Sequence, residues 1–250
     1  NIIPANRISS VGRAFVSALP LPSLNPNVDD GNVNIPAQDI LENKAAQGSI
    51  KLDHHFSDSI SLSGLYLYQL TSEPDANYYP DAKYAAESYQ LERSIHVAVL
   101  NNTYILNPST VASLRWGTNI FNDNTTLPYP FDMRDVPGIN PAFANSLTVQ
   151  KFPSLSLTGY DGTGFSGRGD TKYYSWGVNG SVTRLAGSHS LKIGADYRIL
   201  GVDTLSYGQS AGSYTFSGRF TGANANNPGN TGNAIADLML GYPFSGSLSL

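Results

Sequence analysis

The sequence holds 250 residues with a formal net charge of −4, no cysteine, 40% hydrophobic residues and only 14% charged residues. The acidic balance argues against a nucleic-acid partner, because no cluster of lysine and arginine is present to neutralise phosphates. The lack of cysteine excludes disulfides and thiolate metal sites, and no apolar run approaches the roughly 18 residues of a membrane helix. Soluble domains carry roughly 25% charged residues, so this chain takes most of its polarity from uncharged side chains.

Residues 1–46 are predicted to be loop with one short helix. Ser9 or Ser10 can cap that helix, and its apolar residues recur at three- and four-residue spacing. They are Val11, Ala14, Phe15, Ala18 and Leu19. Pro20 ends the helix, and residues 23–41 are rich in Asn, Pro and Asp, as loops are. The chain begins without an initiator Met or a signal peptide and ends abruptly, so we expect a fragment of a longer protein.

Residues 47–250 are predicted to be strands and loops that follow one repeated plan. A long strand, a tight turn, a second long strand and a long loop follow one another three times. The strands are residues 47–56 and 60–70, 89–106 and 110–121, and the arms of a hairpin over residues 170–200; the long loops include residues 71–88 and 122–151. The tight turns lie near Ser57, Pro108 and Gly187.

Shorter elements surround the hairpin. Residues 152–160 are predicted to be a short strand or the edge of a loop, and residues 161–169 a Gly-rich loop. Residues 201–212 can extend the second arm of the hairpin. The remaining predictions are a strand at residues 213–220, a Gly/Asn loop at 221–232 and an apolar last strand at 234–250.

The hairpin alternates apolar and polar side chains along both arms. Because successive side chains of a strand point to opposite faces, the alternation predicts one apolar and one polar face. The apolar face is predicted to carry Trp176, Val178, Val182, Leu191, Ile193 and Tyr197, and the polar face Ser175, Asn179, Lys192, Asp196 and Arg198.

Two architectures produce such alternation. A soluble β-sandwich predicts short strands with turns every 8–12 residues or so. An outer-membrane barrel predicts strands of about 9–11 residues or more, with tight turns at one end and long loops at the other. The repeated plan favours the barrel. The predicted fold class is therefore all-β: an antiparallel meander that forms a partial outer-membrane β-barrel, an open curved sheet.

Five segments of the chain are recognisable in a fixed order. They are NIIPANRI at residues 1–8, KLDHHFSD at 51–58, GSHSLKIGADYR at 187–198, GRF at 218–220 and ADLMLG at 236–241. These segments resemble the barrel of TonB-dependent outer-membrane receptors, most closely the Oar-like subgroup, whose matching patterns include RxDHxFS, GxHxLKxGxDYR, FSGRFT and ADFLLG. The resemblance runs from end to end of the chain.

The resemblance implies a location, a function and partners. Such receptors carry an N-terminal plug, an energy-coupling box and a barrel of about 22 strands. No plug is present in residues 1–250, and we expect only about eight to ten strands, so the resemblance implies an incomplete barrel. It also implies contact with outer-membrane lipid, energised uptake of a large substrate or surface adhesion, and coupling to the TonB complex through the missing N-terminal region. The transported ligand is not identified, and no cofactor is implied.

Two motifs match enzyme signatures without the context that those enzymes need. Gly162, Gly164 and Gly167 form G-x-G-x-x-G, but a strand follows where a helix must bind the pyrophosphate. Ser210 lies in G-x-S-x-G, but again a strand follows, and no His comes after His189 to complete a triad. We therefore predict that the protein is not an enzyme.

Metal and adhesion sites are not expected either. His54 and His55 are adjacent, so in a strand they face opposite ways and do not share a metal. The loop acids are Asp75, Asp81, Asp132 and Asp135. They lack the regular spacing of a calcium loop and are interpreted as solvated acids. The Arg-Gly-Asp tripeptide at residues 168–170 is too short to be specific.

The polar face of the hairpin has two interpretations. In a barrel this face lines the lumen, where Lys192, Asp196 and Arg198 would line a substrate path or contact a plug. The favoured interpretation is an ion-pair ladder along one strand. A second hypothesis for the whole protein, from a different class, is a secreted or surface β-sandwich that binds glycan or protein through its Tyr-rich loops.

We also expect the isolated chain not to close into a barrel. The polar face carries small residues such as Ser175, Gly177 and Gly194, which suit a wide lumen and would pack a narrow one poorly. An open sheet leaves residues 47–56 and 234–250 unpaired with each other. The long loops at residues 71–88 and 122–151 are expected to be loosely held.

Overall fold

The computed structural model describes residues 2–21, 38–77, 79, 81–85, 89–224, 226 and 231–249. Most of the predicted loop at residues 23–41, and parts of those at 71–88 and 221–232, lie outside the described residues. The helix predicted at the N-terminus is confirmed as α1 (Ser10–Val16), whose first turn is capped by the Ser9 side chain. No helix in the described ranges is long and apolar enough to cross a membrane.

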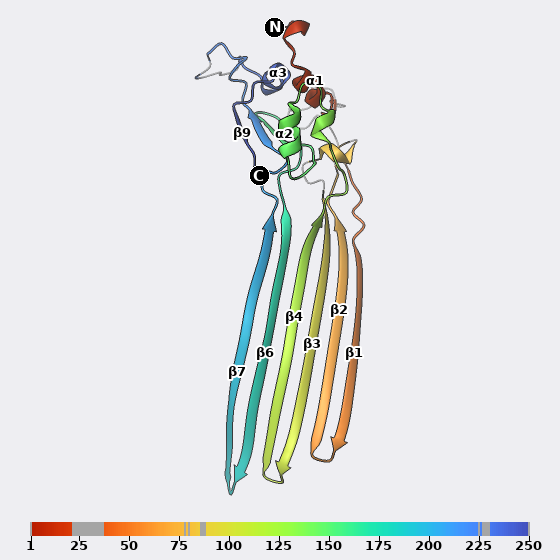
Figure 1. The fold of residues 1–250 in the computed structure, drawn as a ribbon, viewed down its shortest axis with the longest axis vertical. Coiled ribbons are helices and arrows are strands. Elements are labelled where there is room, and N and C mark those ends of the chain that lie inside the picture. The colour runs from red at the N-terminus through yellow and green to blue at the C-terminus, as the bar shows by residue number, and fades with distance from the viewer. Residues whose placement is uncertain are drawn as a thin grey trace.

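In the described part of the chain, six long strands form one antiparallel sheet (Figure 1). They are β1 (Lys44–Ser57), β2 (Ile60–Pro74), β3 (Gln90–Asn107), β4 (Thr110–Thr126), β6 (Gly169–Ala186) and β7 (His189–Ser206). Each strand pairs with the next in this order. Tight turns join them at one end, and the longer connections all lie at the other end. The predicted meander and the predicted asymmetry of its turns are therefore confirmed.

Local chemistry fixes the tight turns. In the β3–β4 turn the Asn107 side chain accepts hydrogen bonds from the backbone N–H and the hydroxyl of Ser109, at 3.1 and 2.9 Å. In the β6–β7 turn Gly187 adopts a φ of 62°, which glycine tolerates without a steric penalty. These residues set the register of each hairpin, because the turn determines which residues face each other.

Several strands are longer than predicted at the end away from the tight turns. Pairing of β2 continues to Pro74 and that of β4 to Thr126, beyond the predicted ends at residues 70 and 121. In this region both faces of the sheet carry polar side chains, such as Glu92 and Arg93 on successive positions of β3. The alternation that marks a half-buried strand is lost there, although the backbone ladder continues.

The sheet is open, as predicted. Among the described residues β1 pairs only with β2 and β7 only with β6, so both are edge strands. The sheet also forms one layer and does not resemble two packed sheets (Figure 1), which is inconsistent with the β-sandwich hypothesis.

The prediction of a last strand at residues 234–250 is wrong. Residues Ala234–Leu240 form helix α3, and only Ser245–Ser247 form a strand, β9. The side chain of Asn233 accepts a hydrogen bond from Ala236 N at 3.0 Å, and Gly241 ends the helix with a φ of 75°. These two capping signals outweigh the apolar run that suggested a strand.

A compact group of short elements lies at the end of the sheet opposite the tight turns, and we call it the loop-end module (Figure 1). Its helices are η1 (Ala5–Arg7), α1, η2 (Ala82–Tyr84), η3 (Met133–Asp135), α2 (Pro141–Ser146) and α3. Its strands are β5 (Ser154–Leu157), β8 (Ser213–Phe216) and β9, which form a second, three-stranded sheet in the described ranges.

The hydrophobic core lies in this module and not on the six-stranded sheet. Phe152 is almost fully buried, and its ring contacts those of Phe15, Tyr84 and Phe131 at centroid distances of 5.0–5.3 Å. The buried residues packed around it include Met133, Val136, Ala144, Leu147, Leu155, Phe216 and Leu238. The expectation that residues 122–151 are loosely held is therefore wrong, because this segment supplies a large part of the core.

Candidate functional site

The strand register determines which side chains share a face of the six-stranded sheet, since directly paired residues of antiparallel strands lie on the same face. In the central hairpin Val178 pairs with Tyr197 and Val182 with Ile193, whereas Asn179 pairs with Asp196. The two predicted sets of side chains therefore lie on opposite faces, as the alternation predicts. The register of β4 with β6 continues this division across the sheet, because Trp116 pairs with Val178.

The apolar face extends over all six strands. Its members include Ile50, Leu52, Leu62, Tyr66, Tyr68, Leu100, Leu114, Trp116, Ile120, Trp176, Val178, Val182, Leu191, Ile193 and Tyr197. No other element packs on these side chains within the described residues, and Ile193 is 78% exposed and Leu52 68% exposed. Such a large exposed apolar surface indicates a non-aqueous environment or a partner surface.

The apolar face ends before the strands do. Toward the loop-end module it gives way to hydrogen-bonded polar side chains: Gln90 Nε2 donates to Ser72 Oγ and Glu92 Oε1, both at 2.6 Å. Asn122 Nδ2 donates to Ser94 Oγ at 2.9 Å. The apolar side chains therefore form a band that begins near the tight turns and stops below the loop-end module.

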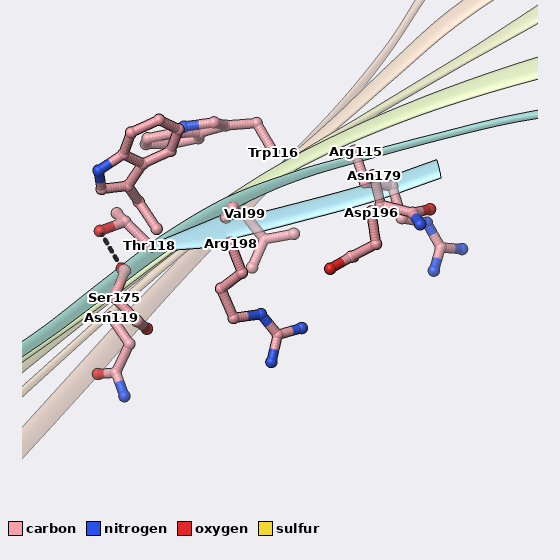
Figure 2. A pocket seen from close by; sticks show the side chains of 12 residues that line it. Val99, Arg115, Trp116, Thr118, Asn119, Ser175, Asn179, Asp196 and Arg198 are labelled. Carbon is pink, nitrogen blue, oxygen red and sulfur yellow. Dashed lines mark hydrogen bonds between the residues drawn. The ribbon is translucent and has the colours of Figure 1, made fainter. Parts of the chain in front are cut away.

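The polar face carries the five residues predicted from the sequence: Ser175, Asn179, Lys192, Asp196 and Arg198. All except Lys192 line one hollow of about 300 Å³ on this face. Lys192 pairs with Thr183, nearer the tight turn, and lies outside the hollow. In Figure 2 the side chains of Asp196 and Arg198 extend from one side of the ribbons and that of Trp116 from the other.

Glycines form the floor of the hollow. Gly117 of β4 pairs directly with Gly177 of β6, and Gly177 pairs with Arg198 of β7. A Cβ at Gly117 would meet only ordinary contacts, the nearest at 3.7 Å, so the space above it is open. The side chains of Arg115, Asn119 and other lining residues surround this bare stretch of backbone.

The residues that β3 and β4 contribute to the hollow were not identified from the sequence as site residues. Arg115, Gly117 and Asn119 belong to the polar set of β4, and Val99 comes from β3. The alternation of polar and apolar residues along β4 was the sequence signal that could have identified them. Alternation alone does not show which face of β4 joins the polar face of the hairpin, because the β4–β6 register decides this.

The predicted ion-pair ladder of Lys192, Asp196 and Arg198 is not formed, since none of the ion pairs found among the described residues joins them. The i, i+2 spacing places them on one face, and the side chains of Asp196 and Arg198 extend away from the ribbons in Figure 2. On this face Lys51 and Asp53 of β1 pair at 3.0 Å, and the other ion pairs lie closer to the loop-end module. There Arg93 contacts Glu73 at 2.6 Å and Asp123 at 2.9 Å.

Apolar side chains also cross the polar face, between the hollow and those ion pairs. Leu67 pairs with Val97, and Ile95, Phe121, Tyr173 and Val202 pair in one row across β3, β4, β6 and β7. The rings of Phe121 and Tyr173 lie 6.0 Å apart with planes 20° apart. The hollow is thus bordered on one side by an aromatic pair and lined on the other by charged side chains.

The two motifs that match enzyme signatures have structural roles in or next to the loop-end module. Gly164 and Gly167 adopt φ values of 82° and 88° in a loop that leads into β6, and no helix follows them. Ser210 is buried, and its hydroxyl donates to the carbonyl of Tyr207. Within the described residues, no group of three or more His, Cys, Asp or Glu is placed to hold a metal ion.

The arrangement suits binding, because it offers donors, acceptors and an aromatic surface on a rigid sheet. In comparison with known families, residues 1–249 match the family described as outer membrane beta barrel domain. No curated protein matches the chain.

Proposed function

The chain belongs to the outer membrane beta barrel domain family, and from that premise we propose that it is part of the barrel of a TonB-dependent receptor, which takes up a large substrate across the outer membrane. The family itself is one of bacterial outer-membrane proteins, so the sheet lies in lipid. The proposal adds energised transport to this location. The proposed transport includes no catalytic step and no cofactor.

The observation that carries the proposal is the pair of unlike faces on one sheet. The apolar stretch of β2 from Ile60 to Leu70 rises about 25 Å if the strand is tilted by about 40°, which matches the apolar band of outer-membrane barrels. The opposite face at the same height carries Arg115, Asp196 and Arg198. Charged side chains at this depth are stable only if they face water, as in a lumen.

The difference between the two ends of the sheet indicates how the sheet is oriented across the outer membrane. Outer-membrane barrels have short turns on the periplasmic side and long loops outside the cell. The tight turns therefore face the periplasm, and the loop-end module faces the exterior, where it would meet substrate first.

The transport part rests on the resemblance of five segments to TonB-dependent receptors. The small residues on the polar face, such as Gly117, Gly177 and Ser181, suit a wide lumen with room for a plug. In the proposal the plug and the energy-coupling box come from a region before residue 1, and the TonB complex binds there.

Co-purification tests this coupling. The full-length protein, extracted in detergent from its own bacterium after mild cross-linking, should retain the periplasmic domain of TonB, whereas a porin treated in the same way should not. Recovery of TonB at only the porin level would overturn the transport proposal and leave the outer-membrane location unaffected.

A further inference from the structure

The polar-face hollow and the aromatic pair beside it form a binding site with a recognisable chemistry. We propose that this site binds an acidic oligosaccharide, a chain of sugars that carries uronic-acid carboxylates. The inference deepens the proposed function, on which it rests, since it names the substrate class for the lumen side of the sheet.

The charge of the hollow favours an anionic ligand. Arg115 and Arg198 project over the glycine floor from β4 and β7, and Asp196 is the acid that lines the hollow with them. Neither arginine takes part in an ion pair found among the described residues. The hollow is thus locally positive on a chain whose net charge is −4. Guanidinium groups bind carboxylates through two parallel hydrogen bonds.

The remaining groups match the sugar ring. Asn119 offers an amide that both donates and accepts hydrogen bonds, as hydroxyl groups of a sugar require. Asn179 Nδ2 donates to the Ala195 carbonyl at 3.3 Å, and the side-chain oxygen of Asn179 can accept from a sugar hydroxyl. Tyr173 is 52% exposed beside Phe121, so an aromatic surface is available to the apolar face of a pyranose. The distance from the Phe121–Tyr173 row to the Arg115–Asn179 row is six residues along β4, about 20 Å, which fits an oligosaccharide better than a single sugar.

An acidic peptide is a less suitable occupant. Peptides that bind β-sheets pair with the backbone of an edge strand. The hollow lies on the face of the sheet, where the backbone groups of β4 and β6 already pair with their neighbours. Only the side chains and the bare glycine floor remain available to contact a ligand, and they suit a ligand that is recognised by its hydroxyl and carboxylate groups.

Isothermal titration of the full-length protein in detergent tests the proposal. The probes are hexagalacturonate and hexamannuronate as acidic sugars, maltohexaose as a neutral sugar and hexaglutamate as an acidic peptide. We expect at least one acidic sugar to bind at least about tenfold more tightly than maltohexaose and hexaglutamate, and to bind more weakly at high salt. Failure of both acidic sugars, or equal binding of either control ligand, would overturn the proposal.

Variants locate the site. Arg115→Gln and Arg198→Gln should each weaken binding about tenfold or more through loss of a charge-assisted hydrogen bond. Gly117→Leu should abolish binding by filling the hollow, since the backbone there accepts a Cβ. The matched controls are Lys51→Gln, on the same face of β1, and Gly48→Leu, where a Cβ meets nothing within 4 Å. Equal losses in the controls would place binding elsewhere and overturn the site.

The outcome separates the two proposals. Loss of sugar binding with TonB still retained would remove the ligand class and keep the transport proposal. Sugar binding that depends on Arg115 and Arg198, in a protein that does not retain TonB, would keep the site and remove energised transport.

Discussion

Val178 and Asn179 are consecutive residues of β6 with opposite surroundings, because their side chains lie on opposite faces of the sheet. In a bilayer Val178→Arg should cost about 2–4 kcal/mol if the site is near the midplane, while Asn179→Arg on the water-filled side should cost far less. The free energy of unfolding in lipid vesicles, measured by urea titration, gives both values. Equal costs would argue against lipid on the Val178 face.

Lys151 in the loop-end module makes stability depend on pH. Lys151 is 1% exposed, and its Nζ donates a hydrogen bond to the Tyr129 carbonyl at 2.8 Å. This burial lowers the pKa of Lys151 from 10.5 to about 8. Between these two values the unfolded chain binds more protons than the folded one, so the module should become more stable as pH rises above about 8. Hydrogen exchange of the core amides, corrected for the intrinsic rate, measures this slope.

The control for that experiment is Lys151→Met, which keeps the length of the side chain and removes the titrating group. The variant should lose the rise in protection between about pH 8 and pH 9.5. This range precedes ionisation of the partly buried Tyr79 and Tyr214, whose pKa values burial raises above 10.0. A slope that is unchanged in Lys151→Met would assign the effect to another group.

At the scale of elements, the contact between α1 and α3 depends on one missing side chain. A Cβ at Gly12 would overlap the carbonyl oxygen of Leu238, and the other close atoms are backbone, which does not move aside cheaply. Gly12→Ala should therefore separate the helices and destabilise the module by about 1–3 kcal/mol. The matched control Gly48→Ala, in open space on β1, should change stability little. Comparable losses in both variants would contradict the account of this contact.

The hairpins could be predicted from the sequence because each contains its own evidence: alternation in at least one arm and a tight turn between two long arms. The second arm of the first hairpin does not alternate, since Leu65 and Leu67 are apolar on the otherwise polar face. The placement of Ser175, Asn179, Asp196 and Arg198 on one face follows from the alternation of the central hairpin. Arg115 and Gly117 join them through a register with β4, a strand that is separated from the hairpin by the whole segment 127–168. No local pattern encodes that pairing.

The core of the loop-end module, unlike the hairpins, could not be predicted from a local pattern in the sequence. Met133, Leu147 and Phe152 are buried together, but they lie among prolines and polar residues with neither a period of 2 nor one of 3.6. Their burial results from tertiary contacts between distant segments, so composition alone suggested loop. For α3, the caps Asn233 and Gly241 were the usable signal, and the apolar run between them was interpreted as a strand.

At the scale of the whole molecule, the open edges of β1 and β7 limit what the chain can do alone. Unpaired backbone groups are costly in hydrocarbon, and only a closed barrel satisfies them. A chain of residues 1–250 in detergent should therefore associate through its edges, and light scattering after size-exclusion chromatography should show oligomers. A stable monomer whose β1 and β7 amides are protected from exchange would show closure and contradict the open sheet.

One face of the sheet meets lipid and the other meets water in this structure of the barrel wall, and a scan along β6 distinguishes the two surroundings. Residues 1–250 hold no cysteine. Once any cysteine elsewhere in the full-length protein is replaced by serine, single cysteines at residues 174–182 can each carry one nitroxide label in a lipid bilayer. Electron paramagnetic resonance then compares collisions with oxygen, which concentrates in lipid, and with a nickel chelate, which stays in water. We predict that even-numbered positions, including Trp176 and Val178, collide mainly with oxygen and odd-numbered positions, including Ser175 and Asn179, mainly with the chelate. Accessibility without a period of two residues along β6 would show that the two faces do not meet different surroundings.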